Sequence, residues 1–220
     1  MQLFLSLLLL ISSSLFSQEL FVQEEEKNLY RSAVEYSFDE VLDNGSYTFL
    51  FEQINGIINI IGHAGSGTHL IIDNRVHAFS NKNAISILKN SQINVYHDKI
   101  EKVIRIKKMS ERYDHKIIGK IDLHLPFNTN LRGTIKNSDL TISKVRGTIA
   151  INTESTDSDL NNLNGNINIT TRGGNISATK LFGEMELTVV SGDINIFDCD
   201  ANSMLTMDNG NIFINGLKGN

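Results

Sequence analysis

The chain has 220 residues and a formal net charge of −5, with one cysteine, one proline and no tryptophan. A single cysteine excludes an internal disulfide and a multi-cysteine zinc site, and the acidic balance argues against a protein that binds nucleic acid electrostatically. The 28 isoleucines and 25 asparagines favour short β-strands joined by tight turns, because isoleucine is β-branched and asparagine tolerates positive φ.

Residues 1–17 are typical of a secretory signal peptide. They carry no charged side chain, and an apolar block from Leu3 to Ile11 precedes a group of small serines. The block is too short to span a bilayer comfortably, so no transmembrane span is predicted. We expect cleavage before Gln18 and export to the periplasm, the cell surface or the extracellular space.

The next two segments are predicted to be an acidic lead-in, residues 18–43, and a β-rich N-terminal part, residues 44–115. One strand is expected in the lead-in, over residues 34–38. In the β-rich part, Ser80 is predicted to cap a short helix over residues 82–89. Further strands are expected at residues 47–52, 57–61, 68–73, 93–96 and 103–107. The glycine-rich loop at residues 62–67 has no lysine and no following helix, so it indicates a β-turn rather than a phosphate-binding loop.

A strict repeat distinguishes the β-repeat domain predicted over residues 116–220. From Gly147 onward the sequence falls into successive lines of nine residues without an insertion. The fifth position of each line is apolar, the third is usually apolar, and the second and fourth are mostly polar, which is typical of a strand with one buried face. Glycine at the first position is predicted to make the turn, although Thr156 and Ala201 replace it in two lines. The predicted turn glycines are Gly147, Gly165, Gly174, Gly183, Gly192 and Gly210.

A longer period of 18 residues is present at the eighth position, which is apolar in alternate lines. We therefore predict an all-β fold in which 18-residue coils, each of two strand–turn units of about nine residues, stack as a single-stranded β-solenoid that resembles a β-helix. The alternative is an antiparallel β-sandwich or meander with hairpin turns. The predicted core residues are Ile149, Ile151, Leu163, Ile167, Ile169, Ile176, Leu181, Leu187, Ile194, Ile196, Cys199, Ile212, Ile214 and Leu217.

These units resemble a bacterial putative-adhesin family, an exported β-strand-repeat domain of unknown function. The resemblance rests on Leu125-Pro126 at the end of a strand and on repeated turn-Gly-x-Ile-x-Ile units, such as residues 164–169 and 191–196. It covers residues 116–220, and residues 55–60 form a weaker earlier copy. The resemblance implies export and surface attachment, and it implies neither a receptor nor a catalytic motif.

Few residues suggest chemistry. Cys199 falls in an apolar column, so it is predicted to be a small buried hydrophobe rather than a nucleophile. The aspartates of the repeat lie at turn or outward positions, which suit calcium binding. However, the GGxGxD pattern of calcium-binding repeats is absent. The six histidines lack metal-ligand spacing. We therefore predict no catalytic residues, no metal site and no cofactor.

The leading hypothesis is a non-enzymatic, adhesin-like envelope or surface protein that presents its sheet faces for binding or scaffolding. One alternative is a β-helix enzyme acting on an extracellular polysaccharide through Asp157 and Asp193. Another is a periplasmic scaffold in envelope signalling. The expected partner is an unidentified surface or envelope component. The final line holds only Gly219 and Asn220, which predicts a truncated C-terminus and association through an uncapped last coil.

Overall fold

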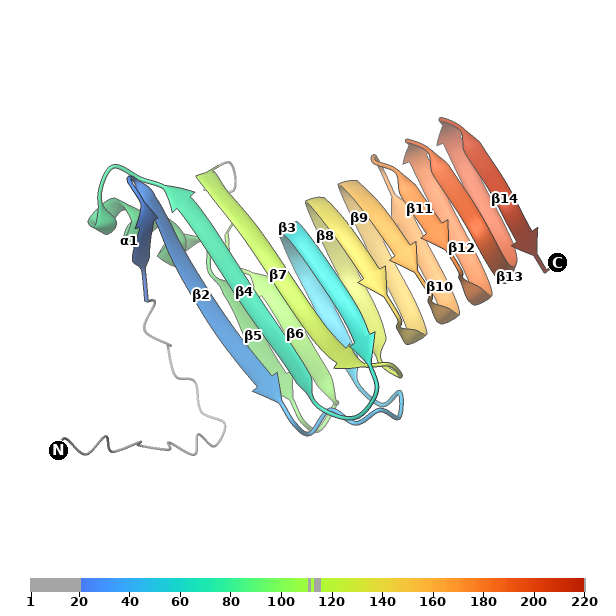
Figure 1. Cartoon of the computed structure of the whole chain (residues 1–220), viewed down its shortest axis with the longest axis horizontal. Helices are drawn as coiled ribbons and strands as arrows, with labels where there is room; N and C mark the ends of the chain where they lie inside the picture. The colour runs from blue at the N-terminus through green and yellow to red at the C-terminus, as the bar shows by residue number, and fades with distance from the viewer. Residues whose placement is uncertain (1–20, 111, 113–115, 220) are drawn as a thin grey trace.

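The computed structural model describes residues 21–110, 112 and 116–219, which form an all-β structure with a single helix (Figure 1). The predicted signal peptide and its cleavage before Gln18 lie outside the described residues. The helix α1 spans Asn81–Asn90. The strands are β1 (Gln23–Glu26), β2 (Leu29–Phe38), β3 (Thr48–His63), β4 (Thr68–His77), β5 (Ile93–Asp98), β6 (Val103–Lys108), β7 (Ile117–Pro126), β8 (Asn130–Ser143), β9 (Arg146–Asn161), β10 (Asn164–Thr171), β11 (Ile176–Thr179), β12 (Phe182–Ser191), β13 (Ile194–Asn209) and β14 (Ile212–Lys218).

The N-terminal part is largely antiparallel. β4 pairs with β2 on one side and with β7 on the other, and β5 and β6 form a hairpin. The predicted helix is confirmed, and Ser80 caps it by accepting a hydrogen bond from the backbone N–H of Asn83 at 3.3 Å. The acidic lead-in holds more structure than its composition predicts. β2 covers ten residues of it because its side chains alternate, with Tyr30 and Ser32 buried while the carboxylate of Glu35 stays exposed.

β3 joins this part to the repeat. It bends at Gln53 and Gly56, whose φ angles are 56° and 106°, and its two halves pair in parallel with the two halves of β8. The second half also pairs in parallel with β7, and the first half with β6. Residues 55–60, the weaker copy of the repeat, therefore lie directly beside the repeat. β3 takes the place of one further 18-residue unit at its N-terminal end.

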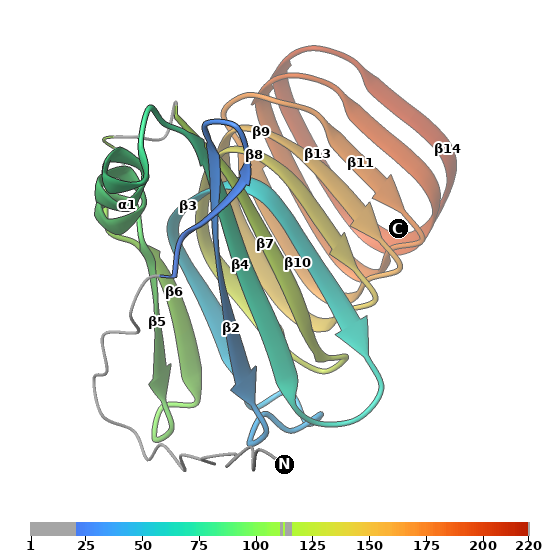
Figure 2. The ribbon, with the colours of Figure 1, turned by 60° about the vertical axis from the view of Figure 1, so that its left-hand side comes forward.

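Within the repeat, each residue pairs with the residue 18 positions later. Gly147 pairs with Gly165, Gly165 with Gly183 and Gly183 with Ala201, and all these ladders are parallel. On the other side of each unit, Ile176 lies between Ser158 and Ile194, again 18 positions away in each direction. A meander with hairpin turns would give antiparallel pairs, so that alternative does not describe the repeat. Figure 2 shows the successive units stacked one behind another toward the C-terminal strand β14.

One buried cluster fills the inside of the units and continues into the antiparallel part, from Phe38 to Ala201. It therefore crosses the boundary drawn from the sequence between residues 115 and 116. The buried members from the predicted core are Ile149, Ile151, Leu163, Ile167, Ile169, Ile176, Leu181, Leu187, Ile194, Ile196 and Cys199. In the last unit, Ile212 and Ile214 are 42% and 46% exposed and Leu217 is partly buried, contrary to the expectation that they belong to the core. Their side chains have a described neighbour on one side only, because β14 pairs only with β13.

The repeat glycines lie where successive units approach most closely. Gly165 has a φ of 135°, and a Cβ placed on it would lie 2.3 Å from the carbonyl oxygen of Gly147 in the neighbouring unit. At Thr156 and Ala201, which replace glycine, the backbone has no positive φ and the strand continues through the position. The repeat also has a second set of bends that the sequence did not reveal. Residues 144, 162, 180 and 198 are 18 apart and all adopt positive φ, although none of them is glycine.

Candidate binding surface

An asparagine–aspartate ladder runs along one outward column of the repeat. The backbone N–H and the side-chain amide of Asn175 both donate to Oδ1 of Asp157, at 2.7 and 3.1 Å. Asp193 donates its N–H to the side chain of Asn175, and Asn211 repeats both of the bonds of Asn175 on Asp193. Each side chain thus links one unit to the next. Asp157 and Asp193, the pair considered for polysaccharide cleavage, lie two units apart with Asn175 between them and serve as hydrogen-bond acceptors in this ladder.

The sheet face that carries this ladder is acidic. Asp139 on β8 is the cross-strand partner of Asp157 on β9 and so extends the same column by one strand. Asp159 lies two residues after Asp157 on β9. On β7 the carboxylate of Asp122 pairs with Lys120 at 2.7 Å and accepts a hydrogen bond from Asn59 at 2.8 Å. Burial alone would raise the pKa of Asp122, but the bonds from Lys120 and Asn59 lower it overall.

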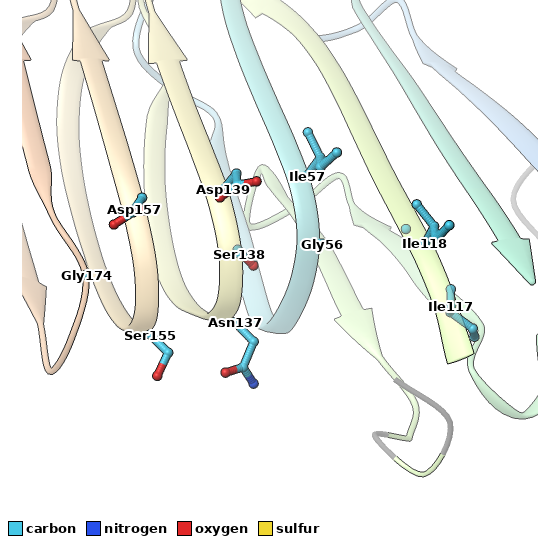
Figure 3. Close-up of a pocket in the computed structure, with 11 residues that line it drawn as sticks. Gly56, Ile57, Ile117, Ile118, Asn137, Ser138, Asp139, Ser155, Asp157 and Gly174 are labelled. Atoms are coloured by element: carbon cyan, nitrogen blue, oxygen red, sulfur yellow. The ribbon is translucent and has the colours of Figure 1, made fainter. Parts of the chain in front are cut away.

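A groove opens at the edge of this face, where the antiparallel part and the repeat separate (Figure 3). β3 turns away at Gly56, whereas β7 runs straight on, so their pairing extends only as far as Ile57 and Lys120. The first residues of β7 then pair only with β4 on their other side. The resulting cavity measures about 580 Å³. Its lining comes from β3, β7, β8, β9 and the turn before β11.

The groove changes in chemistry along its length. Ile57 and Ile118 are 42% and 55% exposed and form an apolar wall, whereas Ile117 points to the other side of β7 and packs against the buried cluster that includes residues of α1. Asp139 and Asp157 stand on the neighbouring strands, both exposed to solvent. The corner residues Asn137 and Ser155 have positive φ, and Figure 3 shows their side chains directed outward from the bend. The groove therefore offers aliphatic surface, negative charge and short polar groups side by side.

Cys199 occupies an interior position. Its thiol is 1% exposed, accepts the N–H of Leu181 at 3.4 Å and lies 3.4 Å from the carbonyl oxygen of Phe197. Burial raises its pKa, which keeps the sulfur protonated and weakly nucleophilic. This placement supports the role of a small buried hydrophobe.

The histidines that the structure describes are dispersed, and no group of three or more metal-binding side chains occurs among the described residues. His115 is not among them. His97 differs in its surroundings: its ring lies 5.3 Å from that of Phe38 and 5.7 Å from that of Tyr47, with Nε2 buried. Burial lowers the pKa of His97, against the opposing effect of Glu40. The glycine-rich loop at residues 62–67 connects β3 to β4, and Gly67 bonds to the carbonyl of Val41 at 2.7 Å.

The groove was not identified from the sequence. Ile57, Ile117 and Ile118 have no periodic relation to Asp139 and Asp157, and their proximity depends on β7 lying beside β3 and β4. Only the column shared by Asp157 and Asn175 follows from the 18-residue period. Within the described residues, no helix is both long and apolar enough to cross a bilayer.

No family model and no curated protein matches the sequence. Similar solved structures include a putative cell adhesion protein from Clostridium sporogenes, with 11% identity, a TM-score of 0.43 and coverage of 82% of this chain and 98% of that one. A putative adhesin from Parabacteroides merdae has 8% identity and a TM-score of 0.29, covering 84% and 96%. A putative lipid binding protein from Parabacteroides distasonis has 9% identity and a TM-score of 0.26, covering 83% and 97%. The expected resemblance is confirmed to this extent: structural neighbours carry the adhesin name, at low sequence identity.

Proposed function

We propose that the protein is a non-enzymatic, exported, adhesin-like component of the cell envelope or cell surface. In this proposal the repeat is a β-solenoid of 18-residue coils that presents its outward sheet faces to a partner. The observation that carries the proposal is the in-register stacking of polar side chains on a continuous apolar core, as in the ladder from Asp157 to Asn211. Stacked repeats of this kind provide extended and rigid surfaces for binding.

The proposed surface is rigid for a physical reason. Each residue of β10 is held by two parallel ladders, one to β9 and one to β12, and its inward side chains Ile167 and Ile169 are fully buried. Binding to such a surface orders little additional chain, so less of the interaction free energy is lost to conformational entropy. The partner is an unidentified surface or envelope component.

Export can be tested with the full chain carrying an epitope inserted at Ser66, in the exposed loop between β3 and β4. Cells are labelled with antibody before and after the outer layer is made permeable, and the N-terminus of the purified protein is sequenced. We expect a mature N-terminus at Gln18 and labelling outside the cytoplasm. Retention of Met1 together with a cytoplasmic location would reject the proposal. Surface labelling of intact cells would separate a surface protein from a periplasmic one.

The non-enzymatic part of the proposal needs its own measurement. The purified chain is incubated with a panel of extracellular polysaccharides, and new reducing ends are measured. We expect no release above that of a heat-denatured sample. Release that is lost in both Asp157→Asn and Asp193→Asn would establish polysaccharide cleavage instead.

A further inference from the structure

We propose that the groove between β7 and the corner of β8 and β9 binds an extended segment of a partner protein that carries both lysine or arginine and aliphatic side chains. This inference rests on the proposed binding function and names the chemistry of the partner for one site. The groove is a hollow of about 580 Å³ at the edge of the acidic sheet face, where the column of Asp139 and Asp157 meets β3 and β7.

The apolar wall favours an aliphatic side chain. Ile57 and Ile118 belong to neighbouring strands and keep 42% and 55% of their surface in water. Exposed isoleucines on adjacent strands gain from covering by another apolar group, because that removes hydrocarbon surface from water. Polar ligands alone would leave this wall unused.

The adjoining part of the groove favours a cation, because Asp139 is the direct cross-strand partner of Ile57 and continues the groove from the apolar wall. Asp139 and Asp157 are cross-strand partners, about 5 Å apart in strand spacing. The described residues give Asp139 no ion pair, and Asp157 is bonded to the neutral Asn175. The cations nearest along the fold are engaged elsewhere, since Lys120 pairs with Asp122 and Lys136 with Glu154. A lysine or arginine from a partner would therefore meet two carboxylates without displacing an existing ion pair.

The length of the groove favours a polypeptide over a small cation. Its lining crosses β7, β3, β8, β9 and the turn at Gly174, which corresponds to roughly 19 Å at the usual strand spacing. An extended chain of about six residues spans that distance. Residues at alternate positions of such a segment point to the same face, so they can place cations on the aspartates at one end and an aliphatic group on the isoleucines at the other.

The test measures fluorescence anisotropy of the labelled hexapeptide KSKSVS with the full chain, at two salt concentrations; its two lysines and its valine share one face when the peptide is extended. The matched peptides are KSKSSS, which lacks the aliphatic group, and ESESVS, which reverses the charge. We expect KSKSVS to bind more tightly than either, with Asp139→Asn and Asp157→Asn each weakening it by about threefold to fivefold. Ile118→Thr should weaken KSKSVS by about threefold and leave KSKSSS unchanged.

Glu184→Gln is the matched control, because it removes one exposed carboxylate from β12 on a strand that does not line the groove. It should change the Kd less than about twofold. Equal weakening by Glu184→Gln would indicate general attraction to an acidic protein and would overturn the proposal. The proposal would also be overturned if KSKSVS did not bind, or if ESESVS bound equally well. Ile57→Thr provides a second variant of the apolar wall. The urea midpoint of each variant shows whether it is folded. Failure here combined with export and surface labelling would reject the groove alone and leave the proposed function standing.

Discussion

The sharpest test of the described packing compares Ile194→Ala with Ile212→Ala. The two isoleucines are direct partners in the parallel ladder between β13 and β14, so they occupy the same column in consecutive units. Ile194 is fully buried, whereas Ile212 is 42% exposed. A buried isoleucine truncated to alanine costs about 2–5 kcal/mol, because the transfer free energy and the energy of the cavity add. At Ile212 part of the side chain is already in water and no closed cavity forms, so we expect a loss of about 1 kcal/mol.

The difference between the two variants should therefore be about 1–4 kcal/mol. For a protein of this size it corresponds to roughly 2–16 °C in the midpoint of thermal unfolding. Urea unfolding followed by circular dichroism measures the loss, and hydrogen exchange of β14 detects unfolding confined to the last unit. Equal losses would mean that Ile212 is covered in solution, and a loss near zero for Ile194→Ala would refute its inward placement.

Three further predictions use other features of the fold. Gly165→Ala should lower the free energy of unfolding by more than about 2 kcal/mol, because the φ of Gly165 is 135° and the new Cβ would lie 2.3 Å from a carbonyl oxygen. Gly45→Ala should lower it by only about 1 kcal/mol, because Gly45 has a φ of 72° but no atom near the new Cβ. The urea midpoints of the two variants test this difference. Cys199 should react with a thiol reagent only as fast as the protein opens, and Cys199→Val should fold normally; rapid labelling of the native protein would contradict this. Because burial lowers the pKa of His97, the folded state binds fewer protons than the unfolded state, so its contribution to stability is lost as pH falls below about 6.5. In His97→Gln the urea midpoint should depend less on pH between pH 5 and 7 than in the unmodified protein. An unchanged pH dependence would count against this role of His97.

Much of the repeat could be predicted from sequence because its geometry is local and periodic. The two-residue period of a strand predicts that Ile167 and Ile169 point inward. The apolar residue at every eighteenth position, such as Leu163 and Leu181, predicts that residues 18 apart are neighbours in adjacent units. The same 18-residue period correctly predicts that Cys199 is buried. It failed for Ile212 and Ile214, because periodicity records which way a side chain points and says nothing of whether another unit covers it.

The antiparallel part was harder to predict because its pairings connect distant segments. The sequence predicts only a short strand over residues 34–38 where the structure has β2, because glutamates dominate its surroundings and its partner β4 lies about 40 residues away. The bends at Lys144, Asn162 and Lys180 were missed for another reason. Positive φ is usually read from glycine, whereas here the ladders on both sides hold other residues in that conformation. The groove combines both difficulties, because it needs the bend of β3 and the distant strand β7.

The two parts of the chain depend on each other through β3. A parallel stack leaves an unpaired edge at each end, and exposed edges of this kind invite association. At the N-terminal end β3 pairs with β8 in the register of a further unit, and β7 with the antiparallel strands β4 and β2 then extends the sheet beyond it. Phe49 meets Leu131 there across 82 positions of sequence, whereas every later unit needs contacts only 18 positions apart. Loop closure is therefore most costly at β3 and cheaper at each unit that follows, so we expect the pairing of β3 with β8 to limit the rate at which the fold is completed.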